Sequence, residues 1–154
     1  MADAYAGVTG EFETYRAEAT APQADVLAAV SQAAHDTLSA LFSDQRADFD
    51  AALVSVLDAV ADGEAEREGV AYGAYAAETM LAAREDDGAD DAVVYPLTGV
   101  PGDYAVDPLH PDQVPLSPGW GSVAPFVIDS STEFGPPPFP SLTVSYTHLT
   151  LPTN

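Results

Sequence analysis

Residues 22–42 read PQADVLAAVSQAAHDTLSALF, and this stretch decides the fold class. Its apolar residues recur at steps of three and four, which places them on one side of an α-helix, whereas a half-buried strand alternates every second residue. The expected buried stripe consists of Leu27, Val30, Ala34, Leu38 and Leu41. Pro22 suits the first helical turn, where no amide hydrogen is needed. The pattern predicts one amphipathic helix over residues 22–42.

The segments on either side also show helical patterns. Residues 1–18 favour a helix that two glycines interrupt, and residues 44–61 favour another helix that the side chain of Ser43 or Asp44 can cap. The stripe expected in the helix over residues 44–61 is Phe49, Leu53, Val56 or Leu57, and Val60. The pair Asp62-Gly63 then breaks the chain.

A fourth helix is predicted over residues 64–86. Glu64 and Glu66 place negative charge at its N-terminus, where the helix dipole favours it, and Gly88 suits its C-terminal stop. The expected stripe is Val70, Gly73, Ala77, Met80 or Leu81, and Arg84. Small residues form one side of this helix: Gly73, Ala74, Ala76 and Ala77. A neighbouring helix can approach that thin side closely.

The amino-acid composition changes near residue 88, since twelve of the thirteen prolines follow that point. Proline blocks helices and removes the amide donors of strands, so residues 89–144 are expected to form an irregular strap. The ring side chains expected to pack onto the helices are Trp120, Phe126, Phe134 and Phe139. The predicted fold class is all-α: a partial bundle of about four helices over residues 1–88, followed by the Pro-rich strap.

The charge of the chain is its extreme bulk feature. The 154 residues carry a formal net charge of −21, from 25 acidic residues against four arginines and no lysine. Such a field repels nucleic acid and anionic membranes, and it is typical of proteins from salt-loving organisms. There is no cysteine, which excludes disulfides and thiolate metal sites, and no apolar run long enough to span a bilayer.

The strap carries a pattern that resembles a known family. Its residues are Leu116, Trp120-Gly121, Pro125-Phe126 and Phe134, followed by Pro136 to Pro138. This order resembles vanadium-dependent haloperoxidases, all-helical relatives of the type 2 phosphatidic acid phosphatases. Gly135 departs from the family, which often has a basic residue before the proline cluster. Further matching segments are Ala33-Ala34-His35, Leu41-Phe42, Gln45, Arg84, Asp87-Gly88, Tyr95-Pro96 and Pro101-Gly102.

The resemblance spans residues 1–143 and implies that the chain is part of a longer protein. The opening MADAYAGV is similar to an internal helix of the family, so an upstream segment and an export signal in the parent are expected. The catalytic motifs of the family follow the strap. Residues 145–154, SYTHLTLPTN, resemble a translated sequencing adapter and are expected to be a non-native tail.

The family holds vanadate, or phosphate in its phosphatase relatives, in a specific pocket. The resemblance implies one lysine, two arginines, a serine, a glycine and a ligating histidine, in motifs that do not occur in this chain. A multiply charged oxyanion needs converging cationic donors, and four scattered arginines do not supply them. We therefore expect no catalytic, cofactor-binding or metal-binding residue among residues 1–154, with vanadate bound by the full-length parent.

The remaining candidates for chemistry are few. His35 lies near an apolar stripe and is expected to be a partly buried, hydrogen-bonded residue of the core. His110 and His148 have no second histidine at metal-ligand spacing. The acidic run after residue 84 does not fit an EF-hand, and Ser130-Ser131-Thr132 lacks the glycines of a nucleophile elbow. The members of that acidic run are Glu85, Asp86, Asp87, Asp90 and Asp91.

The sequence predicts a non-catalytic N-terminal part of a vanadium-dependent haloperoxidase-like protein. Its expected partner is the C-terminal catalytic bundle of the same chain, with neither nucleic acid nor membrane involved. The parent would oxidise halide with hydrogen peroxide or hydrolyse a phosphomonoester. The alternatives are a complete small acidic helical interaction domain from a halophile, and an acidic cation-binding protein. The sequence leaves oligomeric state and localisation open.

Overall fold

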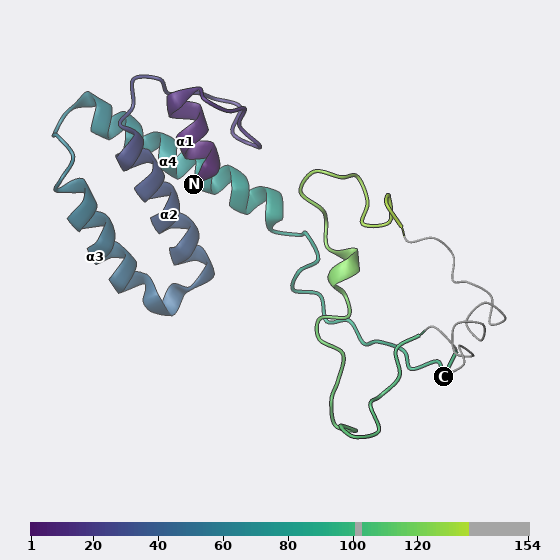
Figure 1. Cartoon of the computed structure of the whole chain (residues 1–154). Helices are drawn as coiled ribbons and strands as arrows, with labels where there is room; N and C mark the ends of the chain where they lie inside the picture. Colours follow the sequence, from purple (N-terminus) through teal and green to yellow (C-terminus); the bar gives the residue numbers. More distant parts are fainter. Residues whose placement is uncertain (101–102, 136–154) are drawn as a thin grey trace, which may run out of the picture. The chain divides into compact units, whose positions relative to one another are not determined.

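The computed structural model describes residues 1–100 and 103–135, which form four α-helices and no β-strand (Figure 1). The helices are α1 (Ala2–Thr9), α2 (Val26–Leu41), α3 (Arg46–Leu57) and α4 (Glu64–Arg84). Short 3-10 turns occupy Ser43–Gln45 and Trp120–Ser122. The predicted all-α class is confirmed. The chain divides into two compact units, Met1–Asp86 and Asp87–Asn154, so all four α-helices lie in the first unit.

Helix α2 is the centre of the first unit, since it contacts α1, α3 and α4 (Figure 1). Its tightest contact is with α4. A Cβ atom at Gly73 would lie 2.3 Å from the carbonyl oxygen of Ala29, and one at Gly69 would lie 2.6 Å from that of Asp25. Only glycine allows the two backbones to approach this closely. The close approach predicted for the thin side of α4 is thus confirmed at Gly73.

The face that α2 buries differs from the predicted stripe. Its buried residues are Ala28, Ala29 and Ala33, whereas Leu27 is 48% and Leu41 62% exposed. The prediction was wrong because the close crossing admits only the smallest side chains, so α2 turns its alanine face toward α4. The residues that α4 buries are Gly69, Tyr72, Gly73, Ala76 and Ala77.

The observed ends of α1 and α2 differ from the bounds predicted from the sequence. Helix α1 stops at Thr9, because Gly10 adopts a left-handed conformation (φ 67°) and donates its amide to the Ala6 carbonyl at 2.8 Å. Pro22 precedes α2 instead of lying in its first turn. The N-cap is Asp25, whose carboxylate accepts a hydrogen bond from the Ala28 amide at 2.9 Å.

Helix α3 is shorter than predicted. A 3-10 turn over Ser43–Gln45 precedes it, and neither Ser43 nor Asp44 is its N-cap. Gln45 holds that position without a side-chain hydrogen bond, and the helix ends at Leu57 instead of residue 61. None of its residues is buried, and its main contact with another α-helix is with α2.

The segment between α1 and α2 is irregular, where the sequence predicted helix to residue 18. The Asp3 carboxylate accepts hydrogen bonds from the amides of Tyr15, Arg16 and Ala17 at 2.7, 2.7 and 3.0 Å. The Tyr72 hydroxyl of α4 donates to the Ala19 carbonyl at 2.7 Å. Three amide donors on one buried carboxylate tie this segment to α1, and Tyr72 ties it to α4.

The second unit is irregular, as expected for the strap, and the packing of its rings onto the helices stays a prediction. Trp120 is 66%, Phe126 58% and Phe134 79% exposed, while Phe139 lies outside the described residues. Many backbone hydrogen bonds of this unit are short-range turns, such as that from the Trp120 amide to the Ser117 carbonyl at 3.0 Å.

We expect Gly73→Ala to lower the free energy of unfolding by about 1–3 kcal/mol, because the added methyl group overlaps backbone atoms of α2. This loss outweighs the roughly 1 kcal/mol by which alanine favours a helix over glycine. Denaturant unfolding followed by circular dichroism measures the change. The control is Gly63→Ala, where the nearest atom would be 4.0 Å away. Equal or greater stability of Gly73→Ala would contradict the close crossing.

Asp3 gives a prediction about acid stability. Burial by itself raises the pKa of its carboxyl, but the three amide donors favour the charged form and leave the pKa below its ordinary value of 3.8. A depressed pKa contributes stability above the unfolded value, and this stability is lost as the pH falls through the folded pKa. We expect Asp3→Asn to cost about 1–3 kcal/mol at pH 7.

The cost of Asp3→Asn should shrink as the pH falls below about 4, because the unfolded carboxyl takes up a proton there before the native one does. Denaturant titrations at pH 7 and at pH 3 measure the difference. Glu13→Gln, an exposed change in the same segment, is the matched control. A cost of Asp3→Asn that does not change with pH would contradict the role of the charge.

Candidate functional site

His35 lies on α2 and reaches carboxylates on two helices. Its Nδ1 atom is 2.7 Å from Oδ1 of Asp36, the next residue of α2. Its Nε2 atom is 2.7 Å from Oδ1 of Asp50, which α3 carries. The His35 side chain is only 10% exposed and that of Asp50 is 54% exposed, so this hydrogen bond joins α2 to α3 from a partly buried ring to a solvent-accessible carboxylate. The expectation of a partly buried, hydrogen-bonded histidine is confirmed.

The carboxylates favour the charged ring. The hydrogen bond with Asp50 raises the pKa of His35, burial opposes this effect, and Asp36 raises the pKa further. A protonated imidazole donates from both nitrogens, whereas a neutral one donates from only one. Arg46 and Gln32 extend the network, with Arg46 Nε 3.9 Å from Asp50 Oδ1 and Gln32 Nε2 donating to Asp36 Oδ1 at 2.8 Å. We call the ion-paired cluster of His35, Asp36 and Asp50, which joins α2 to α3, the His35 clamp.

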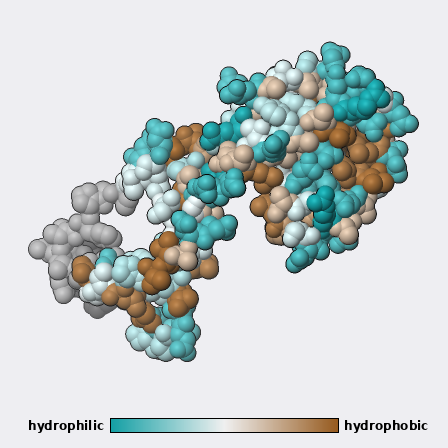
Figure 2. Space-filling view, turned by 180° about the vertical axis from the view of Figure 1, so that it is seen from behind, coloured by the Kyte–Doolittle hydropathy of each residue, from teal (hydrophilic) through white to brown (hydrophobic). Residues whose placement is uncertain are grey.

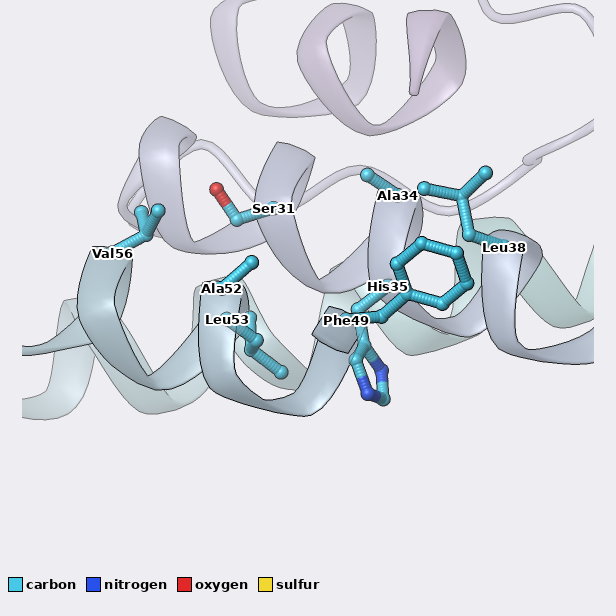
Figure 3. Close-up of a pocket in the computed structure, with 8 residues that line it drawn as sticks. All are labelled: Ser31, Ala34, His35, Leu38, Phe49, Ala52, Leu53 and Val56. Atoms are coloured by element: carbon cyan, nitrogen blue, oxygen red, sulfur yellow. The ribbon is translucent and has the colours of Figure 1, made fainter. Parts of the chain in front are cut away.

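An apolar groove lies beside this clamp, where side chains of α2 and α3 face one another (Figure 3). Its volume is about 170 Å³. The lining residues are Ser31, Ala34, His35, Leu38, Phe49, Ala52, Leu53 and Val56. With both ring nitrogens of His35 held by carboxylates, the groove has no free imidazole to serve as a general base. Its chemistry is apolar contact.

A second groove lies between α2 and α4, with a volume of about 740 Å³. Its lining residues are Asp36, Ala40, Leu41, Ala74, Glu78, Leu81, Ala82 and Glu85. Sequence reasoning missed this groove. The available signal was the spacing of Glu78, Leu81 and Glu85, which places an apolar residue between two acids on one side of a helix.

Other candidate residues from the sequence form hydrogen bonds within local turns. His110 Nδ1 is 2.8 Å from Asp107 Oδ2, and this bond lowers the pKa of the exposed Asp107 carboxyl. Asp87 accepts the Ala89 amide at 2.8 Å in the turn after α4. The hydroxyls of Ser130 and Thr132 are 2.9 Å apart. His148 lies outside the described residues.

The four arginines lie apart and have other partners. The Arg16 guanidinium lies 4.8 Å from the Tyr15 ring centroid, and Arg67 Nη2 is 2.5 Å from Glu64 Oε2. Arg46 faces Asp50, and Arg84 ends α4. The chain has no lysine.

Within the described residues, no three His, Asp or Glu side chains are grouped so as to hold a metal ion. No helix in this part of the chain has the length and apolar character needed to cross a membrane. Comparisons with known protein families, with curated proteins and with solved structures found no match for the chain.

The His35 clamp predicts that stability falls as the pH rises. A raised pKa contributes stability that is complete below the unfolded value near 6.5 and is lost as the pH rises through the folded pKa. Denaturant unfolding at steps from pH 6 to pH 9 should show this loss in the native chain. Asp50→Asn should reduce it, because an amide favours the charged ring less than a carboxylate.

His110→Gln is the matched control, since it removes a histidine from the second unit and should keep the pH dependence of the helical unit. An unchanged pH dependence in Asp50→Asn would contradict the clamp.

Proposed function

We propose that residues 1–144 are a non-catalytic N-terminal part of a vanadium-dependent haloperoxidase-like protein, with a scaffold role. The proposal rests on the strap pattern around Trp120-Gly121 and Pro125-Phe126 and on its agreement with an all-helical body. The parent would oxidise halide with hydrogen peroxide at vanadate or hydrolyse a phosphomonoester. Its cationic cradle would come from residues outside this chain.

The observation that carries the scaffold role is the amount of large apolar surface left in water. Leu27 is 48%, Phe42 49% and Val54 59% exposed in the helical unit. Figure 2 shows apolar residues gathered in patches on this unit, bordered by hydrophilic ones. Burying such surface is worth about 25 cal/mol per Å². Further helices of the parent would gain that free energy by covering it.

The gene sequence downstream of Leu142 tests the proposal most simply. We expect it to encode a lysine, an Arg-Pro pair and a Ser-Gly-His segment. The full-length product should either oxidise bromide with hydrogen peroxide when vanadate is supplied or hydrolyse a phosphomonoester, whereas residues 1–154 alone should do neither. A native stop codon after Leu142 would refute the proposal, and so would tight retention of orthovanadate by residues 1–154.

The second candidate is a complete small acidic interaction domain, which the acid-lined groove between α2 and α4 favours. The two candidates differ in how the isolated chain behaves. A scaffold part should bind a hydrophobic dye and be only marginally stable in dilute buffer, because its apolar side chains are uncovered. A complete domain should unfold sharply and cooperatively in the same buffer.

A further inference from the structure

We propose that the groove between α2 and α4 is a docking site for a cationic amphipathic helix of a partner protein. The inference does not rest on the resemblance to haloperoxidases. It rests on the shape of the groove, its apolar floor and the charge of its rim.

The shape follows from the crossing of the two helices. Gly69 and Gly73 hold the first half of α4 against the first half of α2, and the helices run in the same direction. Toward their C-terminal ends the facing residues become larger, with Leu41 on α2 and Leu81 on α4 lining the groove. The helices therefore leave a space of about 740 Å³, which suits several side chains of a third helix.

The floor of the groove is apolar, and its residues are Ala40, Leu41, Ala74, Leu81 and Ala82. Leu41 is 62% exposed, so much of its side chain lies in water. A helix whose apolar residues recur at steps of three and four could cover this floor, as in other helix-in-groove complexes. Shape and floor together specify an amphipathic helix.

The rim of the groove is acidic. Glu78 and Glu85 lie two turns apart on α4, and Asp36 lines the opposite side from α2. Asp36 already contacts the His35 ring, so the glutamates are the carboxylates that a partner can engage. Lysine or arginine side chains at a spacing of about seven residues on the incoming helix would meet both glutamates.

The strap does not supply the cationic residues, because none of residues 85–154 is lysine or arginine. A second copy of the chain brings another −21 charge, and its approach is opposed by repulsion. A cationic helix of a partner is attracted by the same field, which adds to the association rate.

The test uses the whole 154-residue chain and a labelled synthetic helix that has leucines on one face and flanking lysines. Fluorescence anisotropy at about 0.15 M salt should show saturable one-to-one binding. Leu41→Gln should weaken this binding at least about tenfold, because the variant loses apolar contact area with the incoming helix. Leu27→Gln, a change of another exposed leucine on the same helix, should leave binding unchanged. The Glu78→Gln, Glu85→Gln double variant should bind more weakly and with less salt dependence.

A scrambled peptide of the same composition separates groove binding from general attraction to an acidic protein, and it should bind at least about tenfold more weakly. Equal binding of both peptides, or equal loss in the two leucine variants, would overturn the proposal. So would sedimentation showing a dimer of the native chain that Leu41→Gln dissociates, because a second copy would then occupy the groove.

Discussion

The near contact of the α2 and α4 backbones is the constraint on which the rest of the helical unit depends. Gly69 and Gly73 bring α4 within van der Waals distance of backbone atoms at Asp25 and Ala29. A core built in this way consists mainly of alanine and glycine, with Tyr72 as its large exception. It gains close packing over many small contacts instead of burying large side chains.

The small residues of this core determine which side chains of the helical unit remain exposed to solvent. Because the alanine face of α2 points to α4, Leu27 and Leu41 are left exposed at its two ends. Helix α3 covers part of another face of α2, and the bridge from His35 to Asp50 joins the two helices. Apolar grooves thus border α2 on both sides, one toward α3 and one toward α4.

Much of this fold could be predicted from the sequence. The apolar periodicity of residues 64–86 predicted α4, and its small residues predicted a close neighbouring helix. This was possible because the absence of a side chain at Gly73 can be read from the sequence itself. The buried face of α2 could not be predicted in the same way. An alanine stripe and a leucine stripe both fit a helix over residues 22–42, and the choice depends on contacts such as Ala29 with Gly73, which lie 44 residues apart in sequence.

The candidate site was also predictable only in part. His35 beside an apolar stripe predicted a hydrogen-bonded histidine, but its partner Asp50 is one of 25 acidic residues and has no distinguishing pattern. The carboxylate of Asp3 likewise accepts hydrogen bonds from amides 12 to 14 residues away. These long-range bonds hold residues 15–17 outside a helix, so the helix predicted over residues 1–18 does not form in full. Contacts of this kind are set by tertiary packing, which overrides local propensity.

Hydrogen exchange of the backbone amides tests the central role of the α2–α4 crossing most directly. The account predicts the slowest exchange around Ala29–Ala33 of α2 and Gly73–Ala77 of α4, since these segments open only with the whole unit. Helix α3, which has no buried residue, should exchange much faster. Equal protection of all three helices, or fast exchange at Gly73–Ala77, would contradict it.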